Sequence, residues 1–235
     1  MMEMGFSVVT AKSGLRLGLS YVVLSFIMLV PAVLLAGSST LNLPTHGVPE
    51  GVDLSLYLSL LAVPLVSLAG MLASMPVSLL FVHDKDNGTL EYLLSLGMDQ
   101  KDIFRGYLGA SLLLGSILLV VGLALEVALG LVSKIGFSLL ATQVVLTLAL
   151  GYSVIALVSI MMSAFSALQR QPMGANQPLG IAVGALFLVA AMIVPAVVPA
   201  LTLVLELGVA ALVSLLTLSL LFLSGRLIRR EKMLP

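Results

Sequence analysis

Few residues have types that could hold a metal, and several of them lie in one short polar segment. Asp84, Asp86 and Asp99 could bind a cation for a lipid-modifying reaction, which would make the chain a membrane-embedded enzyme. Their spacing matches neither a familiar catalytic carboxylate motif nor the loop of a calcium-binding hand. His46 and His83 have no second ligand at metal-binding spacing, and cysteine is absent. We therefore expect no metal site.

Motifs for nucleotide binding and nucleophilic catalysis are missing from the chain. The sequence has no Gly-x-x-x-x-Gly-Lys-Ser/Thr phosphate loop, no Gly-x-Ser-x-Gly and no His-Glu-x-x-His. We expect that the chain is not an enzyme and that energy for any driven process comes from a partner. Membrane anchoring explains the basic residues near the C-terminus, so nucleic acid is not an expected partner.

Glu126 and Glu206 are the only acidic residues inside otherwise apolar runs. A carboxylate in lipid is costly, so such residues usually face the interior of a helix bundle or a water-filled cavity. One interpretation places both in a translocation path near its outer mouth, or makes them proton sites of an ion-coupled transporter or channel. The other has them reach the outer interface or pair within the bundle. The sequence leaves both interpretations open.

Membrane-spanning helices must position these residues. Hydrophobic residues make up 60% of the 235-residue chain, charged residues make up 9%, and the mean hydropathy is +1.21. A span needs roughly 20 apolar residues, so the length allows about six spans in a single domain, residues 1–235. Backbone groups in lipid must bond internally and no alternating strand pattern is present, so the expected fold is all-α. The expected spans are 17–37, 54–82, 107–132, 137–168, 179–198 and 201–224.

The lysine and arginine residues indicate how the spans are oriented. Six spans place both termini on one side, and ten of the 11 Lys and Arg residues fall on that side, with Lys134 alone on the other. Because Lys and Arg mark cytoplasmic loops, we expect a multi-pass protein of the cell membrane with both termini in the cytoplasm. The ten residues are Lys12, Arg16, Lys85, Lys101, Arg105, Arg170, Arg226, Arg229, Arg230 and Lys232.

Three segments each permit two interpretations. Residues 1–16 fit an N-terminal interfacial helix or a disordered tail, because they mix apolar and polar types around two glycines. Pro64 and Pro76 predict a kinked second span, in which the kinks serve gating or only packing. The apolar sequence 179–224, interrupted at 195–199, fits two spans joined by an outward hairpin or a re-entrant pair.

Residues 83–105 hold the densest group of charges and are expected to lie in the cytoplasm between the second and third spans. Leu90, Leu93 and Leu94 recur at i, i+3 and i+4, which predicts a short helix with one apolar face. Gly97 ends this helix, and a second short helix then leads into the third span. The leucines could dock on another protein or lie in the bilayer surface, where the many acidic residues would be repelled by anionic lipid.

The string from Asp86 to Leu96, followed by Asp99 to Gly106, resembles the cytoplasmic segment after the second span in type-2 ATP-binding-cassette permeases. In that family an acidic residue, Gly-Thr-Leu-Glu and paired leucines precede a helix that enters the third span. They form a coupling helix, which seats in a groove of the ATPase subunit. Family members also have six spans, cytoplasmic termini and an amphipathic N-terminal helix. The matching residues are Asp86, Gly88, Thr89, Leu90, Glu91, Leu93, Leu94 and Leu96.

The resemblance implies the permease subunit of an ATP-binding-cassette transporter, most simply an exporter, that works with a separate ATPase. The ATPase would dock on the 88–96 helix and would bind the ATP and magnesium, so the permease would carry no cofactor. Two copies of the permease, or two homologous permeases, would pair in the membrane lipid. The Ala, Val, Leu, Ser and Gly residues of the expected path fit lipid, glycan, peptide or drug equally well.

Overall fold

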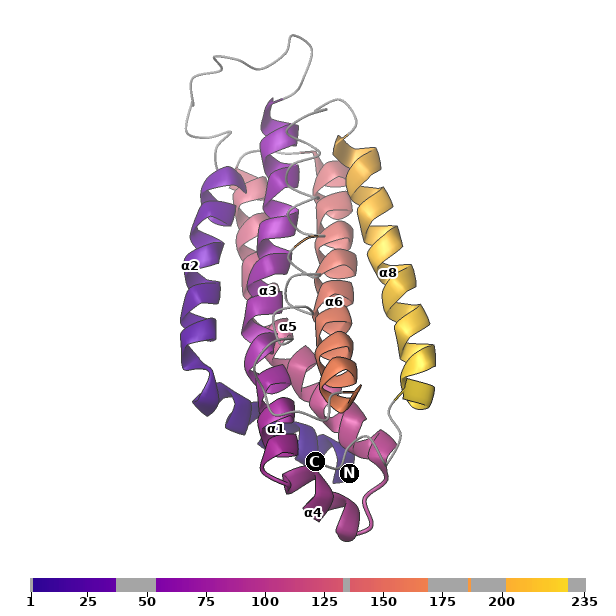
Figure 1. Ribbon diagram of the computed structural model, residues 1–235. Helices are drawn as coiled ribbons and strands as arrows, with labels where there is room; N and C mark the ends of the chain where they lie inside the picture. Colours follow the sequence, from indigo (N-terminus) through magenta and orange to yellow (C-terminus); the bar gives the residue numbers. More distant parts are fainter. Residues whose placement is uncertain (1, 37–53, 133–135, 169–185, 187–201, 228–235) are drawn as a thin grey trace.

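The structure is a computed structural model, which describes residues 2–36, 54–132, 136–168, 186 and 202–227. Every element in this part of the chain is an α-helix, so the predicted all-α class is confirmed for it. The long helices run side by side as a bundle, and α1 and α4 lie together at one end of it (Figure 1). The helices are α1 (Met2–Leu17), α2 (Leu19–Ala36), α3 (Leu54–Asp86), α4 (Thr89–Ser95), α5 (Gln100–Val132), α6 (Phe137–Leu168) and α8 (Thr202–Leu227).

Four of the described helices, α3, α5, α6 and α8, are long and apolar enough to cross a membrane. They coincide with the predicted second, third, fourth and sixth spans, so the chain is a membrane protein. The predicted first span coincides with α2, which has 18 residues and no charged side chain. The predicted fifth span, 179–198, lies outside the described residues except for Leu186, as do the loop at 169–177 and the hairpin at 195–199. The count of six spans stays a prediction.

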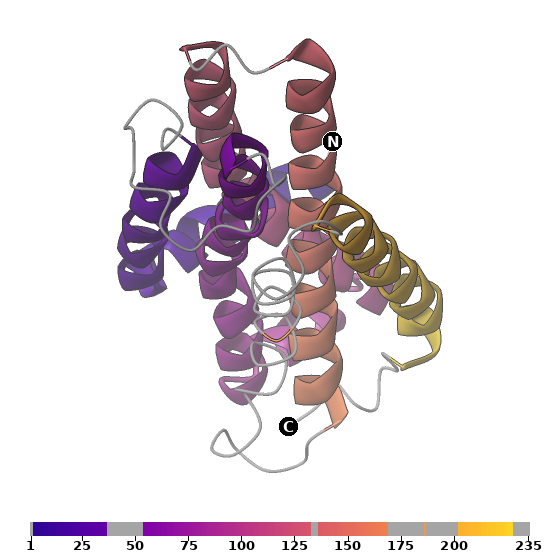
Figure 2. The same cartoon turned by 90° about the horizontal axis from the view of Figure 1, so that it is seen from above.

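Helix α3 occupies the centre of the bundle. It packs against α2, α5 and α6, and α8 lies on the other side of α6 (Figure 2). Nearly all of its span is buried, including Ser67, Ser74 and Ser78. The hydroxyl of Ser67 donates to the Val63 carbonyl at 2.9 Å, and that of Ser74 donates to the Met71 carbonyl at 2.7 Å. The hydroxyl of Ser78 donates instead to Oγ of Ser159 in α6 at 3.5 Å. All three hydroxyls therefore have a partner inside the protein, as a water-free environment requires.

The two prolines of α3 lie inside one helix that continues from Leu54 to Asp86. Both are buried, and the ring of Pro76 faces Gly18, the residue between α1 and α2. A Cβ atom at Gly18 would lie 2.6 Å from the Pro76 ring, so only glycine lets the chain pass at this distance. Packing thus accounts for Pro76. The expected N-terminal helix is present as α1, and it packs against α5 and α3.

A close contact within the bundle joins α3, α5 and α6. A Cβ atom added at Gly115 of α5 would lie 2.6 Å from Cδ1 of Ile155 in α6 and 3.0 Å from the carbonyl oxygen of Gly70 in α3. Small residues permit such close approach of helix backbones in membranes, where packing rather than hydrophobic burial drives association. The contact therefore depends on the absence of a side chain at Gly115.

We expect Gly115→Ala to lower the thermal unfolding midpoint of the purified protein in detergent. The added methyl group meets backbone as well as a side chain, and overpacking of this kind typically costs about 1–3 kcal/mol. Gly208→Ala in α8 is the matched control, because among the described residues nothing lies within 4 Å of a Cβ there. It should leave the midpoint unchanged or raise it, since alanine favours helix by about 1 kcal/mol. Equal midpoints for the two variants would contradict the close contact.

Candidate functional site

Helix α4 is a single short helix held between two glycine turns. Gly88 before it and Gly97 after it have φ values of 72° and 84°, in the left-handed region that favours glycine. At its C-terminal end the Gly97 amide donates to the Leu94 carbonyl at 3.1 Å and the Met98 amide donates to the Leu93 carbonyl at 3.3 Å. This pair of bonds is the Schellman ending of a helix. The chain then continues directly into α5, so the expected second short helix and third span are one helix.

The inner face of α4 is buried against the protein itself. Leu90 is completely buried and Leu94 is 7% exposed. Both belong to a cluster with Phe81 of α3 and with Ile103 and Phe104 of α5. The expectation that the leucines together present a docking face is therefore wrong for Leu90 and Leu94. They fasten α4 to the long helices.

The outer face of α4 points away from the bundle. Tyr92 and Leu96 are 62% and 63% exposed, and Glu91 and Ser95 are exposed beside them. Tyr92 and Leu96 are four residues apart and so lie on one side of a helix. We call these four residues the outer face of α4. Sequence reasoning did not select Tyr92, although its spacing from Leu96 was available.

The other members of the predicted coupling segment flank these two faces. Asp86 is exposed at the end of α3, and Thr89 and Leu93 are partly buried. The side-chain amide of Asn87 donates from Nδ2 to Nε2 of His83 at 2.8 Å, and the backbone amide of Asn87 donates to the His83 carbonyl at 3.0 Å, which closes the last turn of α3. Within the described residues, no three His, Asp or Glu side chains come together as a metal-binding group.

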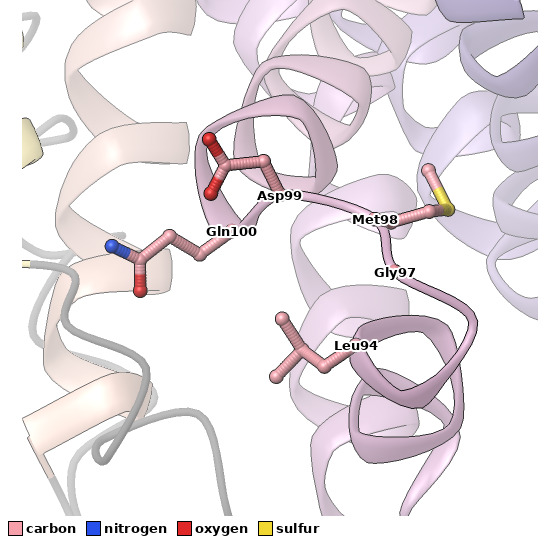
Figure 3. Close-up of a pocket in the computed structure, with 5 residues that line it drawn as sticks. All are labelled: Leu94, Gly97, Met98, Asp99 and Gln100. Carbon is pink, nitrogen blue, oxygen red and sulfur yellow. The ribbon is translucent and has the colours of Figure 1, made fainter.

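A hollow of about 340 Å³ opens at the C-terminal end of α4 (Figure 3). Leu94 lines it from α4, Gly97 and Met98 line it from the connection, and Asp99 and Gln100 line it from the start of α5. Oε1 of Gln100 is buried there and has no hydrogen-bond partner among the described residues. The hollow thus offers an apolar wall and polar groups next to the outer face of α4.

Tyr107 joins three helices just behind α4. Its hydroxyl donates a hydrogen bond to the Asp84 carboxylate of α3. Its ring packs edge-on against Phe6 of α1 and Phe81 of α3, with centroid distances of 5.8 and 5.1 Å. Edge-to-face contacts between aromatic rings add stability beyond the area they bury. Tyr107 of α5 therefore contacts both α1 and α3 at the end of the bundle that carries α4.

Glu126 and Glu206, the expected residues of a translocation path, lie at the other end of the bundle. They are 7% and 2% exposed, and Glu206 is close enough to Glu126 to interact with it electrostatically. The Thr147 hydroxyl of α6 donates to Oε2 of Glu126 at 3.1 Å. Gln143 precedes Thr147 by one helical turn and is also buried. We call Glu126, Gln143, Thr147 and Glu206 the acid group; sequence reasoning found its glutamates and missed the other two.

Comparison of the chain with protein-family models, curated proteins and solved structures gave no match. Two features of the described residues bear on its function. The outer face of α4 lies at one end of the bundle, and the acid group lies at the other.

We expect Tyr107→Phe to destabilise the protein by about 2 kcal/mol, because it removes a hydrogen bond to a carboxylate and leaves the rings in place. Denaturation of Tyr107→Phe, Asp84→Asn and the double variant measures the coupling between the two residues. The double variant should lose less than the sum of the single losses. Tyr92→Phe, which removes an exposed hydroxyl, is the control and should be neutral. Additive losses would show that the two residues do not interact.

Proposed function

We propose that the chain is the permease subunit of an ATP-binding-cassette transporter of the type-2 kind, driven by a separate ATPase subunit that docks on α4. The observation that carries the proposal is the two-sided character of α4. Its inner leucines lie in the core of the bundle, whereas its outer face is exposed and combines an aromatic, an aliphatic and an acidic side chain. A short helix with such a face suits docking into a groove of another protein.

The attachment of α4 suits the transmission of force. Leu90 and Leu94 contact side chains from α3 and α5, so a push on the outer face would move both helices together. Tyr107 extends the connection to α1 through Phe6. Packed interiors deform little and move as units, so a displacement of α4 would reach the membrane spans. This is the property required of a coupling helix.

The proposal includes six spans, with α2 as the first and residues 179–198 as the fifth. Both termini and α4 lie in the cytoplasm of the cell in this arrangement, as the distribution of lysine and arginine favours. Two permeases pair in the membrane and two ATPase subunits bind ATP and magnesium below them. In this proposal the transporter is an exporter, in which closure of the ATPases opens a path toward the outside.

The acid group favours a second candidate, an ion-coupled transporter. Buried carboxyl groups within spans are typical of proton or cation pathways. This candidate predicts transport by the isolated chain in response to an ion gradient, without ATP. The ATP-driven candidate is preferred because only it gives the exposed outer face of α4 a role.

We expect Tyr92→Asp and Leu96→Asp to abolish stimulation of the ATPase by the permease while the variants still insert and fold. A charge placed in a desolvated contact typically costs several kcal/mol, which corresponds to at least a hundredfold loss of affinity. The measurement uses the phosphate-loop ATPase that co-purifies with the wild-type chain, reconstituted with each variant in nanodiscs. ATP hydrolysis and pull-down are recorded together.

Two further variants test the division of α4 into two faces. Lys12→Asp, an exposed change on α1, is the control and should leave stimulation intact. Leu90→Asp should instead lower the yield of folded protein, because it buries a charge in the core. Full stimulation of ATP hydrolysis by the Tyr92 and Leu96 variants would contradict docking on the outer face of α4. The absence of any co-purifying ATPase would contradict it as well.

A further inference from the structure

The acid group contains four buried polar atoms that lack a hydrogen-bond partner among the described residues. Three are carboxylate oxygens, namely Oε1 of Glu126 and both oxygens of Glu206, and the fourth is Nε2 of Gln143. All three side chains are more than nine-tenths buried: Glu126 is 7% exposed, Glu206 is 2% exposed and Gln143 is 5% exposed. Buried polar atoms are nearly always bonded, because an unbonded one costs free energy. Within the described residues, the group therefore has a donor and three acceptors that are open to a ligand.

The charge of the acid group points to the kind of ligand. Two carboxyl groups buried close together in an apolar bundle either keep their protons or ionise against a positive partner, because burial of unpaired negative charge is costly. An ion pair of Arg105 with Asp102, 3.9 Å apart, lies at the opposite end of the bundle.

We propose that the acid group binds a primary ammonium group carried by the transported molecule. An ammonium group has three N–H donors, which equals the number of unpartnered carboxylate oxygens, and it supplies the missing positive charge. An oxygen on the neighbouring carbon atom would accept a hydrogen bond from Nε2 of Gln143. The matching headgroup is therefore an amino alcohol of the ethanolamine type. As a substrate site this rests on the proposed function, but the binding itself needs no ATPase.

Two sources could supply this headgroup, an aqueous amine or a lipid. Glu206 is buried, whereas its neighbours Val204 and Leu207 on α8 are 63% and 48% exposed. The acid group thus lies one helix away from the outer surface of the bundle, which in a membrane is covered by lipid. The chemistry recognised is the same for both sources, and the experiment separates them.

The experiment uses the purified full-length chain without an ATPase. Ethanolamine is added at constant pH and ionic strength, and its dissociation constant is obtained from the rise in the thermal unfolding midpoint. Tetramethylammonium has the same charge but no N–H donor and serves as the control ligand. We expect ethanolamine to stabilise the wild-type chain and tetramethylammonium to have no effect. In a parallel arm, nanodiscs of phosphatidylethanolamine are compared with nanodiscs of phosphatidylcholine.

The variants Glu126→Gln and Glu206→Gln keep the shape of the side chains and remove their charge. Each should weaken ethanolamine binding at least tenfold, and Asp102→Asn should leave it unchanged. Stabilisation in either arm supports the site, and the arm that responds identifies an aqueous or a lipid source.

The proposal is overturned if the unfolding midpoint does not rise in either arm, or if tetramethylammonium raises it as much as ethanolamine does. It is also overturned if ethanolamine binding survives both glutamine substitutions. A further contradicting outcome is that the wild-type chain does not bind ethanolamine and Lys134→Gln does, because Lys134 would then supply the missing charge. Lys134 lies outside the described residues. Absence of ethanolamine binding would not affect the docking role of α4. Absence of ATPase docking would not affect the measurement of ethanolamine binding.

Discussion

The close contact of α3 with α5 and α6 is the constraint on which the rest of the structure depends. Apolar helix faces gain little by leaving lipid for each other, so helices associate where their backbones can approach closely. Gly115 provides that approach between α5 and the Gly70 turn of α3, and Ile155 of α6 fills the remaining space. With α2 on its other side, α3 is enclosed along its span and cannot shift independently of its neighbours.

Because α3 is enclosed, the short helix α4 at its end is held firmly against the bundle. The turns at Gly88 and Gly97 keep the connections as short as residues 87–88 and 96–99, so α4 stays against the ends of α3 and α5. Leu90 and Leu94 share one apolar cluster with Phe81, which makes the short helix an extension of the core. A helix of this length would be marginal by itself in water, so tertiary packing is what keeps it helical.

Hydropathy and glycine positions predicted much of the fold. The expected spans 54–82 and 137–168 agree closely with α3 and α6, and the expected 88–96 helix agrees with α4. The burial of Leu90 was not predictable in the same way, because leucine spacing defines an apolar face without specifying what covers it. Gln143 and Thr147 were missed for a related reason: only their position across from Glu126, on another helix, distinguishes them from other polar residues in spans.

Helix α5 connects the two ends of the bundle. It contributes Ile103 and Tyr107 to the contacts behind α4, and it carries Glu126 near its far end. It is one helix of 33 residues without proline, so it spans about 50 Å at about 1.5 Å per residue. Helix α3 contains two prolines, each of which removes a backbone hydrogen bond and so weakens a helix in bending. A displacement at α4 would therefore have an unbroken helical path to the acid group along α5, and this path passes the close contact at Gly115.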